Sequence, residues 1–227
     1  MKLGILGALP AEVAQVCDHL TNVTTEEYAG VEYYLGTLAG KDVVVCCAGM
    51  GKANAAATTQ VLCLKYGIDQ LIFSGIAGNT SPLLTIGDVV IGKTVVYHDA
   101  EIDMICQNPP FLKEYSGAPA LISAAEAACA THGVHSLTGK IATGDLFIGD
   151  SASKHAIMAK CAPDCVEMEG AAVSQIAAKN EVPCVIIRAM SDDADEAGKE
   201  KLVGTNFSID EYVATATKIV VSMVEAL

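Results

Sequence analysis

Short apolar runs recur along the chain and alternate with segments of helical character. Continuous apolar runs that end at glycine or polar residues are typical of strands buried within a sheet. Strands that alternate with helices predict an α/β fold, here a three-layer α/β/α sandwich around a mixed, mainly parallel sheet. The predicted strands are Lys2–Leu6, Tyr33–Leu38, Asp42–Cys47, Leu71–Ser74, Asp88–Gly92, Val95–Asp99, Thr138–Thr143 and Cys184–Ile187.

Helices are predicted between these strands, most of them rich in alanine. The last one begins at a capping box, Ser208-Ile209-Asp210-Glu211, and has an apolar face that extends to Leu227. A length of 227 residues suits one large domain, so we expect a single domain over residues 1–227. The other predicted helices begin at Pro10, end at Tyr66, or span Pro119–His132, Ser151–Lys160 and Ala171–Lys179.

Acidic residues follow two apolar strands in the last third of the chain. Glu167 and Glu169 flank Met168 where a strand gives way to a helix, and Arg188 precedes Asp192 at the end of another strand. Open α/β sheets bind small molecules at this edge, so these side chains are candidates for one site. The alternative is that the acids only cap helices, and the pattern alone leaves both interpretations open.

Glu12 falls in the first turn of the helix that begins at Pro10, above the end of the first strand. An acid is favoured there by the helix dipole, and it is equally placed to act as a base at the ligand edge. His98 is likewise either a hydrogen-bonded structural histidine or a ligand.

Two glycine-rich stretches follow predicted strands. Gly49-Met50-Gly51-Lys52 is not a phosphate loop, because Cys46 occupies the first glycine position and Ala53 replaces Ser or Thr. Gly75-Ile76-Ala77-Gly78 is predicted as a turn that lets the backbone approach a ligand.

Two segments are predicted as loops. Residues 104–117 form an irregular loop with apolar side chains, including Ile105, which favours packing against a second subunit. Residues 192–205 form a charged loop and a candidate lid.

The net charge of −13 argues against nucleic acid or an anionic membrane as partner. The nine cysteines include no C-x-x-C pair, so we interpret them as reduced core residues of a cytoplasmic protein. The apolar run Leu3–Leu9 is too short for a signal peptide and meets Pro10 at once, and no run approaches the ~18 residues of a membrane span.

Taken together, the motifs resemble the 5′-methylthioadenosine/S-adenosylhomocysteine nucleosidases, which have the purine nucleoside phosphorylase-like fold. The resemblance spans essentially the whole chain and is specific as a set. It rests on Gly7-Ala8-Leu9-Pro10-Ala11-Glu12, Gly49-Met50-Gly51-Lys52, Tyr97-His98-Asp99-Ala100, Thr143-Gly144-Asp145-Leu146-Phe147-Ile148, Val166-Glu167-Met168-Glu169 and Arg188-Ala189-Met190-Ser191-Asp192.

The resemblance implies hydrolysis of an N-ribosidic bond that releases adenine and a 5′-thioribose, without a cofactor or a metal. It implies that Asp192 protonates adenine N7, that Glu12 activates water, and that Arg188 helps to hold that water. The implied substrate-binding residues are Glu169 on the ribose hydroxyls, Met168 along the sugar, Phe147 stacked on adenine, the Ile148 backbone at its Watson–Crick edge, Leu9 and Met50 at the 5′ group, Ile105 from the partner of a homodimer, and Glu167, Ala77, Gly78, Ile76 and Ser191 around them.

The chemistry of this reaction independently requires carboxylates and a proton donor near the ribose and the purine. Cleavage of the C–N bond develops positive charge on the ribose, which nearby carboxylates stabilise, and the purine needs a proton to leave. Arg188, within an apolar strand, must be paired, and Glu12 is the partner we expect. Ile76 stands where many members of the family have a serine. The resemblance therefore leaves open one polar contact to the sugar or to water.

Three other functions remain open from the sequence. A phosphorolytic purine nucleoside phosphorylase has the same fold, but phosphate sites favour several arginines and this chain has one. A futalosine-type nucleoside hydrolase would use the same acids. A non-catalytic nucleoside sensor would need the pocket but neither Glu12 nor Asp192.

Overall fold

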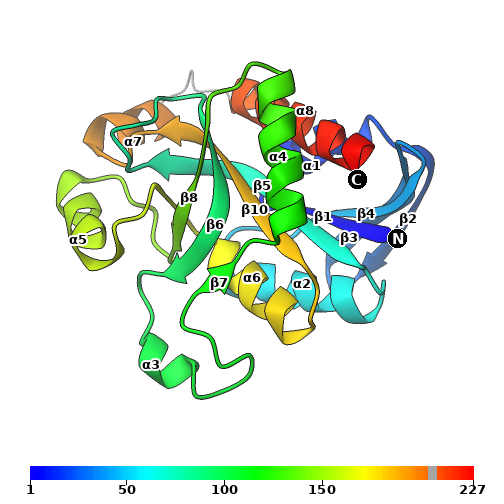
Figure 1. Ribbon diagram of the computed structural model, residues 1–227, viewed down its shortest axis with the longest axis horizontal. Coiled ribbons are helices and arrows are strands. Elements are labelled where there is room, and N and C mark those ends of the chain that lie inside the picture. Colours follow the sequence, from blue (N-terminus) through cyan, green and yellow to red (C-terminus); the bar gives the residue numbers. More distant parts are fainter. Residues whose placement is uncertain (204–208) are drawn as a thin grey trace.

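The computed structural model describes residues 1–203 and 209–227, and contains one sheet covered by helices (Figure 1). The strands are β1 (Lys2–Gly7), β2 (Thr21–Tyr28), β3 (Val31–Leu38), β4 (Lys41–Cys47), β5 (Gln70–Asn79), β6 (Val89–Tyr97), β7 (Tyr115–Ser116), β8 (Ser136–Thr143), β9 (Cys165–Glu167) and β10 (Cys184–Asp192). The helices are α1 (Pro10–Cys17), α2 (Lys52–Leu64), α3 (Ile102–Ile105), α4 (Pro119–Thr131), α5 (Ser151–Cys161), α6 (Gly170–Lys179), α7 (Glu196–Val203) and α8 (Asp210–Ala226).

The sheet is mixed and part of it closes on itself. Its strand order is β10-β6-β8-β9-β5-β1-β4-β3-β2, and β10 also pairs with β5. Strands β5, β10, β6, β8 and β9 therefore form a closed ring, from which β1, β4, β3 and β2 extend as an open wing. The predicted α/β class and mixed sheet are confirmed, but the closure could not be read from the sequence.

Helices cover both faces of the sheet, as predicted. Helices α1, α4 and α8 lie on one face, and α2 and α6 lie on the other (Figure 1). Alternate residues along each strand point to opposite faces and so enter separate cores. Thus Leu3, Ile5, Val43, Val45, Ile72, Val185 and Ile187 pack under α1, α4 and α8, whereas Leu6, Val44, Cys46, Leu71, Phe73 and Ile186 pack under α2 and α6.

Two predicted segments differ in the structure, and one strand was missed. The segment Gly75–Gly78 is not a turn, because β5 continues through it to Asn79 and stays paired with β10. The strands predicted at 88–92 and 95–99 are one strand, β6, with a register shift between Gly92 and Thr94. Strand β2 was missed because it is an exposed edge with no apolar face to reveal it.

The two segments predicted as loops contain regular structure. Residues 104–117 hold the end of α3 and the short strand β7, and α3 projects away from the sheet (Figure 1). Helix α7 lies within 192–205. Ser208, the first residue of the predicted capping box, lies outside the described residues.

All nine cysteines are free thiols, four of them buried. Within residues 1–203 and 209–227, no helix combines the length and apolar character that a membrane span requires.

Candidate active site

One cavity of ≈ 350 Å³ brings most of the predicted site residues together. Its walls come from the β1–α1 junction, the β4–α2 turn, the second half of β5, the loop after β8, the β9–α6 junction, the end of β10 and the start of α8. The lining residues are Ala8, Leu9, Glu12, Met50, Ile76, Ala77, Gly78, Phe147, Val166, Glu167, Met168, Glu169, Arg188, Ser191, Asp192 and Ile209.

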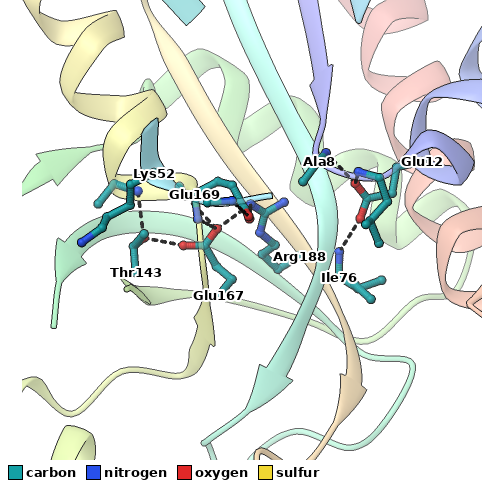
Figure 2. Close-up of polar contacts among 12 residues, drawn as sticks. Ala8, Glu12, Lys52, Ile76, Thr143, Glu167, Glu169 and Arg188 are labelled. Carbon is teal, nitrogen blue, oxygen red and sulfur yellow. Dashed lines mark hydrogen bonds and ion pairs between the residues drawn. The ribbon is translucent and has the colours of Figure 1, made fainter. Parts of the chain in front are cut away.

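Glu12 is held by backbone N–H groups from the β1–α1 turn and from β5. Its Oε2 accepts hydrogen bonds from Ala8 (2.7 Å) and Leu9 (2.9 Å), and its Oε1 accepts one from Ile76 at 3.2 Å (Figure 2). The bond from Leu9 also caps the start of α1, and the same residue lines the cavity. Burial raises the pKa of Glu12, opposed by the charge of Arg188 and by these three donors.

Arg188 pairs with Glu167, not with Glu12 as expected. Its Nη2 lies 2.5 Å from Glu167 Oε2 and 3.7 Å from Glu169 Oε2. The prediction failed because β9, which carries Glu167, joins the ring of strands beside β5, and this neighbourhood is a tertiary feature. The guanidinium also lies 4.0 Å from the centre of the Phe73 ring, and its buried Nε has no hydrogen-bond partner among the described residues.

Glu167 has both carboxylate oxygens occupied by the protein. Its Oε2 accepts from Arg188 and from the N–H groups of Glu169 and Gly170, and its Oε1 accepts from the Thr143 hydroxyl (Figure 2). Thr143 in turn accepts from the Ala171 N–H at 2.8 Å. Glu167 therefore fixes the start of α6 and the position of Arg188 together.

Glu169 has one oxygen bound by the turn before α2. Its Oε1 accepts a hydrogen bond from the Gly51 N–H at 2.7 Å. Burial, with the nearby charge of Glu167, raises the pKa of Glu169 to about 7, although Arg188 and the Gly51 N–H act in the opposite direction. This carboxyl group therefore changes charge near neutral pH.

Asp192 is aimed into the cavity by an irregularity at the end of β10. The register with β5 shifts between Met190 and Asp192, and such a bulge turns the following side chains. Asp192 accepts hydrogen bonds from the Ser191 hydroxyl and the Ala194 N–H, each at 2.8 Å. Burial raises the pKa of Asp192 despite these two donors.

Apolar side chains at the cavity mouth are only partly covered. Phe147 is 50% exposed and Met50 is 62% exposed. Ile148 lines a smaller adjoining cavity of ≈ 30 Å³, which it shares with Phe147 and Asp192. Ile105, at the end of α3, lines neither cavity in the single chain.

Comparisons with known proteins agree with this geometry. The phosphorylase superfamily model matches residues 2–225. A 5′-methylthioadenosine/S-adenosylhomocysteine nucleosidase of Shewanella baltica is 41% identical over 209 residues, which cover 86% of this chain and 85% of the relative. The enzyme of the same name from Shewanella sediminis is 38% identical over 242 residues, covering 100% and 98%.

This chain belongs to the methylthioadenosine/S-adenosylhomocysteine nucleosidase family. The resemblance inferred from the motifs is thereby confirmed. A solved nucleosidase of this name from Neisseria meningitidis, in complex with methylthio-immucillin-A, superposes with a TM-score of 0.93 and 32% identity, covering 100% of this chain and 99% of the other. A futalosine hydrolase mutant of Helicobacter pylori superposes with a TM-score of 0.90 and 26% identity, covering 100% of both chains.

Four residues of the two cavities in this nucleosidase family member were given no role from the sequence. Ala8, Val166 and Leu146 stand within the motifs quoted for the resemblance, but only their neighbours were named as site residues. Leu146, which is 67% exposed, lines the smaller cavity next to Phe147. Ile209 lies just before α8, far along the chain, and no local pattern marks it.

Proposed function

We propose that the chain hydrolyses the N-ribosidic bond of 5′-methylthioadenosine, S-adenosylhomocysteine and 5′-deoxyadenosine. The products are adenine and the 5′-substituted ribose, which places the reaction in methionine salvage and S-adenosylmethionine recycling. The observation that carries the proposal is the convergence of Glu12, Glu169 and Asp192 on one cavity with partly apolar walls. Membership of the nucleosidase family supports the same reaction.

Asp192 is the proposed general acid. As the bond between C1′ and N9 breaks, its electron pair moves into the purine, and a proton from Asp192 to N7 neutralises the leaving group. A raised pKa supports this role, because a buried carboxyl keeps its proton at a pH where an exposed one has lost it. Ser191 and the Ala194 N–H hold the carboxyl group in place.

Glu12 is the proposed general base. Water attacks C1′ as positive charge develops on the ribose, and Glu12 accepts the proton that the water loses. Arg188 lines the same cavity as Glu12, which supports a part for its guanidinium in holding this water. Ile76 contributes its N–H to Glu12, while its side chain offers the water no hydroxyl.

The remaining residues are proposed to bind the nucleoside. Glu169 receives the ribose hydroxyls and Met168 lies along the sugar, while Ala77 and Gly78 form the β5 wall. Phe147 stacks on adenine, and the Ile148 backbone meets its Watson–Crick edge. Glu167 acts indirectly, since its oxygens already hold Arg188 and the start of α6.

The 5′ group is proposed to lie against apolar residues. Leu9, Met50 and Ile209 line the cavity and offer no cation to a phosphate, whose burial without a partner would be costly. We propose that the chain forms a homodimer in which Ile105 of the partner subunit completes this end. The family model spans residues 2–225 as one match, which supports a single domain, and nine free thiols support a cytoplasmic location.

Two related reactions remain as alternatives. Phosphorolysis is disfavoured because Arg188, the one arginine of the chain, is bound to Glu167. Futalosine hydrolysis is kept as a second candidate because a futalosine hydrolase mutant from Helicobacter pylori superposes closely.

The test measures free adenine and the sugar product from methylthioadenosine, with and without concentrated phosphate. We expect adenine and free methylthioribose in both conditions, and a loss of turnover of ~100-fold or more in Asp192→Asn, which keeps the shape of the acid but not its proton. Phosphorus NMR that detects a sugar 1-phosphate would replace the hydrolase with a phosphorylase. Near-normal turnover in Asp192→Asn would remove Asp192 as the acid.

A further inference from the structure

A polar cluster beside the cavity joins three segments that are distant in the sequence. We call Lys52, Asp99 and Asp145 the Lys52 cluster. The Lys52 Nζ lies 2.8 Å from both carboxylate oxygens of Asp99 and 3.5 Å from Asp145 Oδ2. These residues begin α2, follow β6 and follow β8, and none of them lines the cavity.

Backbone groups bind the same segments a second time. The Lys52 N–H donates to Asp145 Oδ1 at 2.8 Å, and the Asp145 N–H donates to Asp99 Oδ2 at 2.9 Å. The side chains of Lys52 and Asp99 are only 23% and 22% exposed. Burial raises the pKa of Asp99, but its bonds to Lys52 and to the Asp145 N–H outweigh this, and the net pKa is lowered. Such a partly buried, charge-assisted network restrains geometry more than a single surface ion pair does.

The cavity residues next to this cluster have little other support. Met50 lies two residues before Lys52, and Phe147 lies two residues after Asp145; both line the cavity and both are at least half exposed. Core packing therefore does little to fix either side chain. Between Met50 and Lys52, the Gly51 N–H donates to Glu169. In Figure 2, Lys52 lies on the opposite side of the Arg188–Glu167–Glu169 group from Glu12.

We infer that the Lys52 cluster is a positioning device that fixes the Met50 and Phe147 walls relative to each other, and so sets the affinity for the nucleoside. This inference rests on the proposed function. Lys52 does not touch the substrate in this arrangement. It is a positioning residue that acts through the turn before α2 and the loop after β8.

The first test measures how accessible the loop after β8 is to solvent, and it does not depend on catalysis. The chain has no tryptophan, so Phe147→Trp places the only tryptophan on the loop after β8, where it can be excited selectively over the tyrosines. We expect Lys52→Met in this background to raise the acrylamide quenching constant by about 2-fold or more, because the loop opens more often. The matched control is Lys65→Met, which removes a lysine–carboxylate contact of the same length, 2.8 Å to Glu26, outside the cavity lining.

The second test measures kinetics with methylthioadenosine in the protein without the reporter. Loss of uniform binding should raise KM by about 10-fold and leave kcat within about 3-fold, whereas the Lys65→Met control should change neither. Asp99→Asn should have the same effect as Lys52→Met. Because both break one network, the double variant should raise KM by about 10-fold, not by the ~100-fold of independent sites.

Unchanged quenching and KM in Lys52→Met, or fully additive effects with Asp99→Asn, would overturn the inference. Asp99→Asn, which keeps the shape of its residue, decides the question if Lys52→Met does not fold. A wild-type protein that does not cleave methylthioadenosine would refute the proposed function, while the quenching test would still decide whether the Lys52 cluster positions the loop.

Discussion

Glu169 links the charge of the candidate site to the stability of the fold. Its pKa rises from an ordinary 4.5 to about 7 on folding, through burial and the charge of Glu167. Between these two pH values the folded state binds more protons than the unfolded state, so this group lowers the stability of the fold as pH rises. Burial of Glu169 therefore destabilises the fold at neutral pH.

Glu169→Gln should remove this loss while keeping an acceptor for the Gly51 N–H. We expect the variant to become more stable than wild type by an increasing margin between pH 4.5 and about 7, reaching about 1–3 kcal/mol or roughly 2–10 °C in Tm. Thermal unfolding at a series of pH values measures the difference. The control is Glu26→Gln. A hydrogen bond from Lys65 lowers the pKa of Glu26, so the charged form stabilises the fold and this variant should be less stable than wild type at neutral pH. A margin for Glu169→Gln that does not grow with pH would contradict the assignment.

At the scale of elements, β5 lets two charged side chains of the candidate site approach each other, because it carries a glycine between them. A Cβ on Gly75 would lie 2.4 Å from Arg188 Nη1 and 2.8 Å from Glu12 Oε1. Strand β5 cannot move aside, because it is paired with β1 on one edge and with β10 on the other. The glycine at this position therefore sets how closely Glu12 and Arg188 approach.

Gly75→Ala should displace Arg188 or Glu12 and lower kcat/KM by about 100-fold, the effect expected of a shift near 1 Å at a catalytic group. Steady-state kinetics and thermal unfolding should be measured together. Gly4→Ala on β1 is the matched control, since the nearest side chains to its Cβ would be Ile68 and Leu71 of the core. We expect it to cost about 1–3 kcal/mol of stability and to leave kcat/KM unchanged. Equal losses of kcat/KM in the two variants would show that crowding of the sheet, and not the position of Glu12 and Arg188, is responsible.

At the scale of the whole molecule, the segment after β6 has apolar side chains that the single chain does not cover. Met104 and Phe111 are 66% and 64% exposed, on a segment that projects from the sheet (Figure 1). Exposed apolar patches of this kind mark protein–protein contacts. This supports the proposed homodimer, in which the cavity gains a wall from the partner subunit.

Ile105→Glu should place a charge in that contact. We expect weaker self-association and a KM for methylthioadenosine raised by about 10-fold or more, because an unpaired buried charge is costly. Light scattering and kinetics measure the two effects. Leu64→Glu, on the exposed side of α2, should change neither. A variant or wild-type monomer with full activity would rule out the shared cavity.

The sequence by itself determined the α/β class, most strands and helices, and nearly all of the cavity residues. Local patterns carry this information, because apolar runs specify buried strands and the acids follow directly after them. The acids at residues 12, 169 and 192 could be chosen as candidates because open α/β sheets bind small molecules at this edge, although the pattern alone left helix capping open. Most of the other cavity residues were implied by the family resemblance.

Only the tertiary structure decided which charges meet and how the sheet closes. Arg188 pairs with Glu167 because β9 inserts between β5 and β8, a non-local pairing that no sequence period encodes. Strand β2 has no apolar face, and Gly75 to Gly78 continue a strand because β10 pairs with them, so tertiary contacts override local preference at both places. Ile209 lines the cavity and the Lys52 cluster lies beside it, each from segments distant in the sequence, so only folding places them there.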